Sequence, residues 1–361
     1  MNAIHQPARS TARLDLWDNP QGTDGFEFVE YTGPDCAALD ALFRNMGFTA
    51  VAKHNSRPVT LYRQGDISFL LNAETDGHAA RFRSAHGPSI CSIAFRVADA
   101  AQTQAHAVST GAVVPGVAPV VDAPVIEGIG GSLLYLVDRY GAKGDVYGDF
   151  TFFPGVDAHP AGHGLTDIDH LTHNVMRGNM ETWAGFYERI FNFREVRYFD
   201  IEGKLTGLKS KAMTSPDGKI RIPINESSDD KSQIEEYLHA YNGEGVQHVA
   251  LSSGDIVATV ESMKTDIRFL DTPETYYELV DARVPGHGLD LEPFRRNRIL
   301  IDGAPTQDQG LLLQIFTENV IGPIFYEIIE RRGNQGFGEG NFRALFESIE
   351  LDQIRRGVLE G

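Results

Sequence analysis

The sequence predicts an α+β fold made of two similar halves, each assembled from units of a strand, a helix and several further strands. Hydrophobic spacing predicts this unit four times along the 361 residues, twice in each half. At roughly 150 residues per domain, a chain of this length is expected to form two domains with ample core.

Short segments recur in the same order in the two halves. The pairs are 26–28 with 168–170, 93–99 with 249–255, and 137–141 with 329–333, at offsets of 142, 156 and 192 residues. One such match would be noise, but three in the same order indicate a duplicated scaffold.

Strands are predicted where apolar residues alternate or run together, and helices where they recur at helical spacing. The helix predicted over 35–46, for example, places Leu39, Phe43 and Met46 on one face and stops at Gly47. In the first half we predict strands over 26–31, 59–62, 67–71, 90–97 and 132–137 and helices over 35–46 and 100–109. In the second half we predict strands over 167–175, 196–200, 206–213, 219–224, 246–252, 311–316 and 324–330 and helices over 180–190, 232–241 and 256–265.

Composition divides the chain into five segments. Residues 1–24 are polar and contain two prolines, so they are expected to be a loose leader, and the Gly-, Pro- and Phe-rich stretch 142–164 is the best linker candidate. We expect a leader over 1–24, a first domain over 25–150, a linker over 151–164, a second domain over 165–332 and a C-terminal segment over 333–361.

The charge balance argues against two classes of partner. The chain has 50 acidic and 32 basic residues, a net charge of −18, which disfavours nucleic acid and an anionic membrane surface. Two cysteines are too few for a disulfide framework. The sequence contains neither an apolar run of about 20 residues nor a secretory signal peptide, so we expect a cytoplasmic protein.

Three titratable residues occupy the centres of matched strands in the second half. They are His170, His248 and Glu327, separated by 78 and 79 residues, so three strands of one curved sheet would have to bring them together. Two histidines and one carboxylate on one face of a metal, with open positions opposite, are the arrangement of non-haem Fe(II) oxygenases. The sequence therefore predicts an iron site in the second half.

The first half supplies a comparison for this prediction. The equivalent positions, by the offsets of the repeat, hold Phe28, Ser92 and Tyr135, none of which is a good ligand. A duplicated scaffold with one working metal site would show this asymmetry.

The other histidines have simpler interpretations. His173 follows His170 by three residues, so on a strand it faces the opposite side and is predicted to be structural. His163 and His287 lie in Gly-His-Gly turns and are interpreted as surface or loop residues. Either His170 or His248 alone would be interpreted as a satisfied core histidine, and only the set of three in matched strands favours a metal.

Longer stretches of the second half are specific enough to compare with known families. They are IDHLTHNV, KSQIEEYL, GVQHVALSS, the IPINE run at 222–226, LLLQIFT and GFGEGNFRALFESIE. In this order they resemble the 4-hydroxyphenylpyruvate dioxygenase family of the vicinal oxygen chelate superfamily, over about 165–350. Weaker likeness in FEFVEY and SICSIAFRV extends the resemblance to nearly the whole chain. It implies two open β-barrels built from βαβββ modules, with iron only in the C-terminal barrel.

The resemblance also implies roles for individual residues. His170, His248 and Glu327 match the iron ligands. Phe316 and Phe342 match two aromatics that sandwich an aromatic ligand. The polar residues that match the pocket lining are Ser210, Asn225, Gln233, Gln247 and Gln314, and those that match its walls and lid are Pro223, Phe325, Phe337, Asn341 and Leu345.

The amides of this set are expected to serve catalysis, because an amide can bond a phenol without becoming charged. They are Asn225, Gln233, Gln247 and Gln314. Gln247 directly precedes His248, so strand alternation would point its side chain away from the metal. Either a local twist of the strand or an indirect role is needed, and the sequence leaves both open.

The activity implied by the resemblance is the oxidation of 4-hydroxyphenylpyruvate by O₂ to homogentisate and CO₂, in tyrosine and phenylalanine catabolism. The implied cofactor is one Fe(II) per chain, with O₂ as co-substrate. No 2-oxoglutarate is needed, because the substrate carries its own 2-oxo acid. We expect the partner to be this small aromatic 2-oxo acid and the protein to be a homo-oligomer, a dimer or a tetramer.

Three other functions remain open on the same scaffold. A hydroxymandelate synthase would share the ligands and the substrate but oxidise the benzylic carbon; the Pro223-Ile224-Asn225 run and Phe342 favour the dioxygenase. An extradiol or glyoxalase-type enzyme would have a different C-terminal segment. A metal-free protein that binds a small aromatic would not need the intact ligand set.

The C-terminal segment is predicted to be a hinge followed by a helix. Residues 333–340 contain four glycines, and Asn341 is suited to cap a helix. Apolar residues then follow at helical spacing, at Phe342, Leu345, Phe346 and Ile349. Two interpretations stay open, a packed terminal helix or a lid that closes over a bound substrate.

Overall fold

The computed structural model describes residues 15–202, 207–230, 232–341 and 344. The first half contains the strands β1 (Phe26–Thr32), β2 (Thr49–His54), β3 (Val59–Gln64), β4 (Ile67–Asn72), β5 (Ser89–Arg96), β6 (Val125–Glu127), β7 (Leu133–Val137) and β8 (Phe150–Phe152). Its α-helices are α1 (Cys36–Asn45), α2 (Gly77–His86) and α3 (Ala100–Ser109).

The second half repeats this plan with additional helices. Its strands are β9 (Leu165–Val175), β10 (Arg194–Glu202), β11 (Gly207–Thr214), β12 (Arg221–Ser227), β13 (Gly245–Ser253), β14 (Leu300–Gly303), β15 (Leu311–Phe316) and β16 (Phe325–Arg332). Its α-helices are α4 (Met180–Phe191), α5 (Gln233–Tyr241), α6 (Ile256–Met263), α7 (Glu274–Glu278), α8 (Val280–Arg283) and α9 (Glu292–Arg296).

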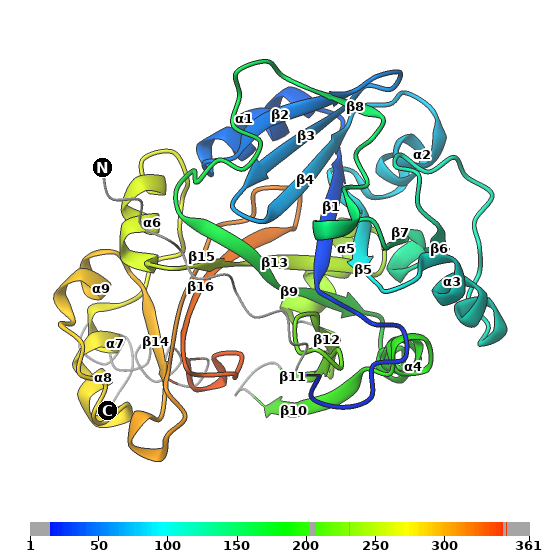
Figure 1. Cartoon of the computed structure of the whole chain (residues 1–361). Helices are drawn as coiled ribbons and strands as arrows, with labels where there is room; N and C mark the ends of the chain where they lie inside the picture. Colours follow the sequence, from blue (N-terminus) through cyan, green and yellow to red (C-terminus); the bar gives the residue numbers. More distant parts are fainter. Residues whose placement is uncertain (1–14, 203–206, 231, 342–343, 345–361) are drawn as a thin grey trace.

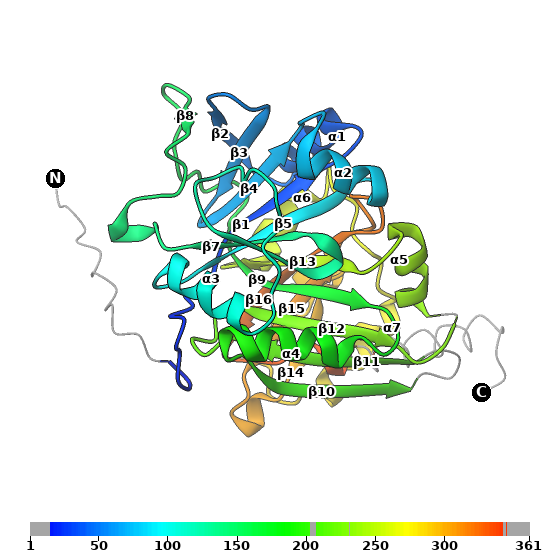
Figure 2. The same cartoon turned by 90° about the vertical axis from the view of Figure 1, so that its right-hand side faces the viewer.

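Each half forms one eight-stranded mixed sheet, and the two sheets lie against each other (Figures 1 and 2). The strand orders are β6-β7-β5-β1-β4-β3-β2-β8 and, taken in the matching direction, β14-β15-β16-β13-β9-β12-β11-β10. Strands that are equivalent in the sequence repeat occupy equivalent places, apart from the extra edge strands β8 and β14. The predicted α+β fold of two half-barrel domains with internal repeats is confirmed.

The strands and helices predicted from the sequence are present, with ends shifted by a few residues, but several elements were missed. These are β2, β6, β8, β14, α2 and α7–α9. The buried face of α2 consists of Ala79, Ala80 and Phe82, so its hydrophobic spacing is weak. The strands β6 and β8 have three residues each, too few to show a period.

Equivalent aspartates explain part of the sequence repeat. Asp99 caps α3 by accepting a hydrogen bond from the backbone N of Gln102 at 2.9 Å, and Asp255 caps α6 through Ala258 N at 3.1 Å. An N-cap of this kind is worth about 1 kcal/mol, because it satisfies a backbone donor that the helix leaves unpaired. The repeat therefore preserves the start of the same helix in both halves.

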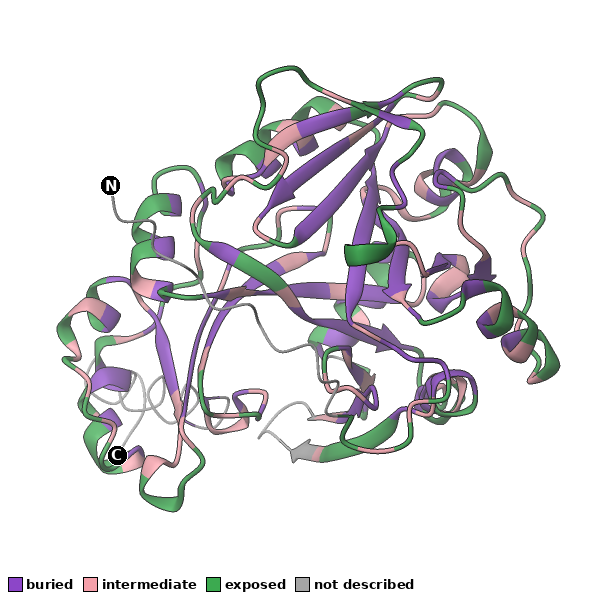
Figure 3. Ribbon diagram, viewed as in Figure 1, coloured by how far each residue is buried: buried purple, intermediate pink, exposed green. Residues whose placement is uncertain are grey.

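Alternate side chains of each sheet enter different cores. One face of both sheets packs with the helices into a single core that spans the two halves. The other face of the first sheet holds its own apolar cluster, which includes Phe28, Ala94 and Tyr135. On the corresponding face of the second sheet, the apolar cluster among the described residues has three members, Ala250, Leu312 and Ile329. Figure 3 shows most strand residues of the two sheets buried, and the polar residues His170, His248 and Glu327 of the second sheet are buried as well.

Residues 15–24 were expected to belong to a loose leader, and this expectation is wrong. Leu16 N donates to Pro216 O at 2.7 Å, and the indole of Trp17 donates to Asn192 O at 2.8 Å. Lys219 forms an ion pair with Asp24 at 2.5 Å. The segment is held by backbone groups and by one aromatic ring, which its polar composition did not reveal. Residues 1–14 of the expected leader lie outside the described residues.

The two sheets are joined by residues 153–164. Strand β8 pairs with β2, so the first sheet extends to Phe152, two residues past the predicted end of the first domain. The other domain boundaries stay predictions. No helix in the described part of the chain is long and apolar enough to cross a membrane.

His173 lies on the helix-covered face of β9, as predicted. It is fully buried, and its Nε2 lies 2.7 Å from the hydroxyl of Tyr187 in α4. Burial in these surroundings lowers the pKa of His173 to about 3. A group of this kind links folding to pH.

We predict that His173 makes the fold sensitive to acid. An unfolded histidine titrates near pH 6.5, so between about pH 6.5 and 3 the unfolded chain binds more protons than the folded one. The free energy of unfolding should therefore fall as the pH falls through this window, and His173→Gln should reduce that fall. Urea unfolding of the metal-free protein at pH 7 and pH 5 measures it. His159→Gln, at an exposed histidine, is the control, and equal pH dependence in both variants would contradict the prediction.

Candidate metal centre

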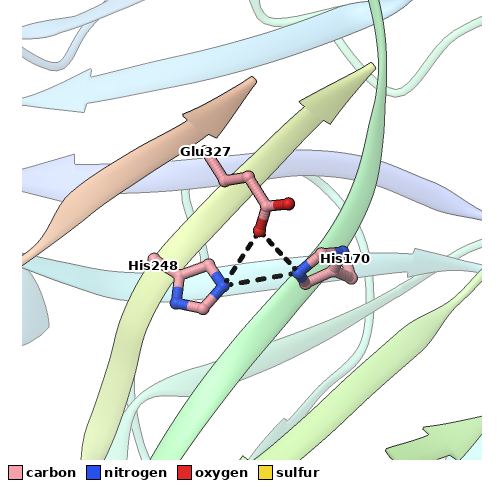
Figure 4. Close-up of side chains that lie close together, drawn as sticks. All are labelled: His170, His248 and Glu327. Carbon is pink, nitrogen blue, oxygen red and sulfur yellow. Dashed lines mark hydrogen bonds and ion pairs between the residues drawn. The ribbon is translucent and has the colours of Figure 1, made fainter. Parts of the chain in front are cut away.

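Three neighbouring strands bring His170, His248 and Glu327 together (Figure 4). Strand β13 lies between β9 and β16, and its residue Ala250 pairs with His170 on one side and with Glu327 on the other. His248 precedes Ala250 by two residues and shares its face. The small side chain of Ala250 leaves the space between the two neighbouring strands free.

The three ligand atoms form a compact triangle. The Nε2 atoms of His170 and His248 are 3.3 Å apart. Glu327 Oε2 lies 3.3 Å from His170 Nε2 and 3.5 Å from His248 Nε2. All three residues are buried, and among the described residues they are the one group of His, Cys, Asp and Glu whose ligand atoms converge in this way.

A β-bulge precedes each histidine. Between β9 and β13 the register skips Asp169 on one strand and Gln247 on the other. Each skipped residue turns an oxygen towards the next side chain: Asp169 Oδ1 lies 2.8 Å from His170 Nδ1, and Gln247 Oε1 lies 3.1 Å from His248 Nδ1. The bulge explains how the side chain of Gln247 reaches His248 although the two residues are consecutive, because an extra residue breaks the strict alternation of the strand.

This geometry suits a divalent transition metal. A histidine that donates from Nδ1 presents the lone pair of Nε2, so two nitrogens and a carboxylate oxygen converge on one point. Three acceptors so close together repel one another unless a cation lies between them. Atoms about 2.1 Å from a common ion and at right angles are roughly 3.0 Å apart, which is close to the observed separations.

Burial shifts the pKa of all three side chains, and interactions with neighbouring groups shift each pKa further. Burial lowers the pKa of His170, but the charge of Glu327 and the contact with Asp169 outweigh it and raise the pKa above its ordinary value. For His248 burial prevails, and its pKa is lowered. Burial raises the pKa of Glu327, but the contacts with His170 and His248 together outweigh this effect and keep the pKa below its ordinary value. Glu327 is therefore ionised at neutral pH and can attract a cation.

A chain of amides runs from the cluster to the C-terminal segment. Gln314 Nε2 lies 3.4 Å from Glu327 Oε1, and Asn341 donates to Gln314 Oε1 at 3.0 Å. Tyr276 donates in turn to Asn341 Oδ1 at 2.6 Å. Asn341 was expected to cap the helix, but the helix already begins at Glu339, so its side chain is available for this network.

Aromatic rings line two sides of the triangle. Phe325 stacks on His248 with ring centroids 4.8 Å apart, and Phe337 meets His170 edge-on at 5.6 Å. Phe316 contacts Phe325 at 6.1 Å. These rings form an apolar wall beside the three ligand atoms.

The remaining predicted pocket residues are placed less uniformly. Ser210 pairs with Asn225 across β11 and β12, and Pro223 shares the face of Asn225 by alternation. Gln233, at the start of α5, is exposed, and no contact within the described residues joins it to the cluster. Phe342 and Leu345 lie outside the described residues, as does most of the predicted C-terminal helix.

Sequence reasoning missed Asp169, Arg331 and Tyr276. Asp169 was concealed because alternation places it on the opposite face from His170, whereas the bulge brings the two together. Arg331 follows Glu327 by four residues and therefore shares its face, which was a usable signal. Nothing in the sequence pointed to Tyr276.

In the first half, the positions equivalent to the three ligand residues hold side chains that do not bind a metal. Ala94 pairs with Phe28 and with Tyr135, as Ala250 does with His170 and Glu327, so the predicted equivalence of these positions is confirmed. The rings of Phe28 and Tyr135 lie 5.2 Å apart and fill the space. Ser92 donates a hydrogen bond to the buried carboxylate of Glu30.

Comparison with known proteins extends over both halves. Residues 17–152 match the family model for the N-terminal region of hydroxyphenylpyruvate dioxygenase. Residues 167–279 match the model for the glyoxalase, bleomycin resistance protein and dioxygenase superfamily. The junction between the two matches falls in the segment that connects the two sheets.

Three relatives cover nearly the whole chain. The chain is 60% identical to a 4-hydroxyphenylpyruvate dioxygenase of Pseudomonas aeruginosa over 348 residues, which is 94% of this chain and 97% of the relative. It is 60% identical to the hemolysin VllY of Vibrio vulnificus over 350 residues, 94% of this chain and 98% of the relative. A solved structure of a mutant 4-hydroxymandelate synthase from Streptomyces coelicolor superimposes with a TM-score of 0.77 at 25% identity, over 92% of this chain and 99% of the other.

We predict that the three residues of the triangle hold the metal and that their counterparts do not. His248→Ala and Glu327→Ala should each lower the Fe(II) affinity by at least about tenfold, because a three-ligand site has no spare donor. Metal content after anaerobic loading and gel filtration measures the loss. Ser92→Ala, at the position equivalent to His248, should lose stability but keep its iron. Iron retained by His248→Ala and lost from Ser92→Ala would reverse the assignment of the two halves.

Proposed function

The chain belongs to the 4-hydroxyphenylpyruvate dioxygenase family, and from this premise we propose that it converts 4-hydroxyphenylpyruvate and O₂ to homogentisate and CO₂ with one Fe(II) bound by His170, His248 and Glu327. Identity of 60% to a dioxygenase of this name over nearly the full length is the observation that carries the proposal. The buried His-His-Glu triangle supports it, because the reaction needs a metal with open positions.

The metal supplies what the side chains cannot. Fe(II) held by these residues would provide open coordination positions for the 2-oxo acid and for O₂, and it would relay electrons from the 2-oxo acid to O₂. His170, His248 and Glu327 would hold this metal, since their ligand atoms converge on one point. The remaining residues orient the ring of the substrate and exclude water.

The aromatic wall performs the exclusion. Phe325 and Phe337 pack against the two ligand imidazoles, so water reaches neither ring from that side. Phe316 stands at the end of β15, opposite Glu327, where a substrate ring can stack on it. Aromatic pairs of this kind contribute roughly 0.5–1.5 kcal/mol beyond the area they bury.

The polar residues orient the substrate without adding charge. Ser210 and Asn225 pair on neighbouring strands, and we assign the phenol end of the substrate to them because their side chains can form hydrogen bonds with its hydroxyl group. Gln314 bonds both Glu327 and Asn341, so it orients the carboxylate ligand and joins it to the C-terminal segment. The role of Gln233 stays a prediction from the family, as do those of Phe342 and Leu345. The homo-oligomer and the cytoplasmic location also stay predictions.

Hydroxymandelate synthase is the rival reaction on the same substrate. The solved enzyme of that name shares the fold at 25% identity, whereas the dioxygenase relative stands at 60%. The protein should be loaded with Fe(II) without oxygen, given 4-hydroxyphenylpyruvate and then O₂, and the product identified by chromatography and mass. Homogentisate is the expected product. Hydroxymandelate as the main product would refute the proposal.

One glycine determines whether Gln314 can keep its two hydrogen bonds. Gly338 has φ +76°, and a Cβ atom built there would lie 1.7 Å from Gln314 Oε1. Gln314 is buried, so a methyl group at this point would force its side chain away from Glu327 and Asn341. Gly333 has a similar φ of +87°, but a Cβ atom there would meet nothing closer than 3.7 Å.

We predict that Gly338→Ala damages turnover more than Gly333→Ala does. Both variants pay about 1–2 kcal/mol for a side chain in the left-handed region. Only Gly338→Ala displaces Gln314, and a misplacement of this size should lower kcat by about tenfold or more. Oxygen uptake and thermal unfolding of the two variants measure both effects. Equal losses of kcat would show that Gln314 does not depend on Gly338.

A further inference from the structure

We propose that Arg331 is a positioning residue of the metal site. It holds Asp169 against His170, and it also anchors the loop 333–340, whose residue Phe337 contacts the same histidine. The inference rests on the proposed function, since it concerns the same metal site. It adds two charged residues that belong neither to the ligands nor to the substrate pocket.

Arg331 donates two parallel hydrogen bonds to the carboxylate of Asp169. Its Nε lies 2.7 Å from Asp169 Oδ2 and its Nη2 lies 2.8 Å from Oδ1. Oδ1 also accepts from His170 Nδ1 at 2.8 Å, so one oxygen joins the arginine to the imidazole. A planar guanidinium fixes the plane of a carboxylate, and the carboxylate then fixes the plane of the ring.

The electrostatics of Asp169 agree with this role. Its side chain is 4% exposed, and burial alone would favour the neutral acid. The hydrogen bonds that Asp169 accepts from Arg331 and His170 stabilise the charged carboxylate instead. The ionised carboxylate keeps the proton of His170 on Nδ1 and leaves Nε2 free to bind a metal.

The third nitrogen of Arg331 binds the loop that follows its own strand. Nη1 donates to the backbone oxygen of Gly336 at 2.6 Å and lies 3.2 Å from that of Asn334. The guanidinium also lies 5.8 Å from the ring centroid of Phe337, which contacts His170. One side chain therefore sets both the orientation of a ligand and the position of the apolar residue beside it.

A second arginine also contacts Asp169 and the loop. Arg221 in β12 lies 3.4 Å from Asp169 Oδ2, and it donates to Gln335 Oε1 at 2.8 Å. Because a single contact of 3.4 Å is weak, Arg221 cannot replace the two short bonds of Arg331. It strengthens the link between the loop and Asp169 without setting the plane of the carboxylate.

The first half offers a matched control. Glu27 is the residue equivalent to Asp169, occupies the same kind of bulge, and precedes Phe28 in place of His170. It is buried and paired with Arg96 at 2.5 Å. Breaking this pair disturbs a similar bulge and a similar ion pair, but no metal ligand lies beside it.

The experiment compares Arg331→Met and Asp169→Asn with Glu27→Gln and Arg96→Met in the full-length chain. Affinity for Fe(II) alone, without oxygen or substrate, is measured by competition with a chelator. Loss of a residue that orients a ligand typically costs 10–100-fold in metal affinity, and this loss is expected for Arg331→Met and Asp169→Asn. The two first-half variants should bind Fe(II) within about twofold of wild type by the same measure, although they lose thermal stability.

Hydrogen exchange separates the two contacts of Arg331. Arg331→Met should speed the exchange of backbone amides in 333–340, because the loop loses the two contacts between Arg331 Nη1 and the backbone oxygens of Asn334 and Gly336. Asp169→Asn retains Nη1 and its two carbonyl partners, so it should weaken Fe(II) binding while the loop stays protected. Faster loop exchange in Asp169→Asn than in Arg331→Met would overturn the proposed division of roles.

The outcomes separate this proposal from the proposed function. The positioning role would be overturned if Arg331→Met bound Fe(II) as tightly as wild type, or if Glu27→Gln lost as much Fe(II) affinity as Arg331→Met. Formation of homogentisate by the wild type would still support the proposed function. Loss of affinity confined to the second-half variants, with a product other than homogentisate from wild type, would support the positioning role and refute the function. A wild-type protein that takes up no Fe(II) would refute both.

Discussion

The metal centre depends on the way β13 pairs with its two neighbours. The antiparallel ladder to β9 and the parallel ladder to β16 meet at Ala250, which places His170 and Glu327 on either side of it. Backbone hydrogen bonds determine this register, so three residues far apart in the sequence arrive within 3.5 Å of one another. A slip of one residue in either ladder would turn a ligand to the helix-covered face.

Two β-bulges orient the histidine side chains that the strand pairing brings together. A regular strand would hide Asp169 and Gln247 on the face opposite the ligands, but the inserted residue brings each oxygen to an Nδ1 atom. The histidines are therefore held from behind, and their Nε2 atoms face Glu327. The same local irregularity at Glu27 in the first half shows that the bulge belongs to the scaffold, and that the metal site makes use of it.

Because the scaffold is duplicated, the first half can stabilise the fold with an apolar inner face while the second half buries a polar cluster. The first half fills its inner face with Phe28, Tyr135 and their neighbours, which removes apolar surface from water and stabilises the fold. The second half places imidazoles and a carboxylate at the same positions, where burial is costly unless partners satisfy them. Those partners come from neighbouring strands and from the C-terminal segment, through Arg331 and the chain from Gln314 to Asn341. The site is thus tied to a segment that lies outside either repeat.

The sequence by itself determined the fold class, the repeat and the three members of the triangle. Strand alternation and matched offsets are local or pairwise properties, so His170, His248 and Glu327 could be identified together with their silent counterparts at Phe28, Ser92 and Tyr135. Only the tertiary structure decided which neighbours orient them. Bulges break the alternation that sequence reasoning assumes, and therefore Asp169 escaped notice and the direction of Gln247 stayed open. The exposure of Gln233, the anchoring of residues 15–24 and the bond from Tyr276 to Asn341 likewise depend on contacts between distant segments, which no period within a single segment encodes.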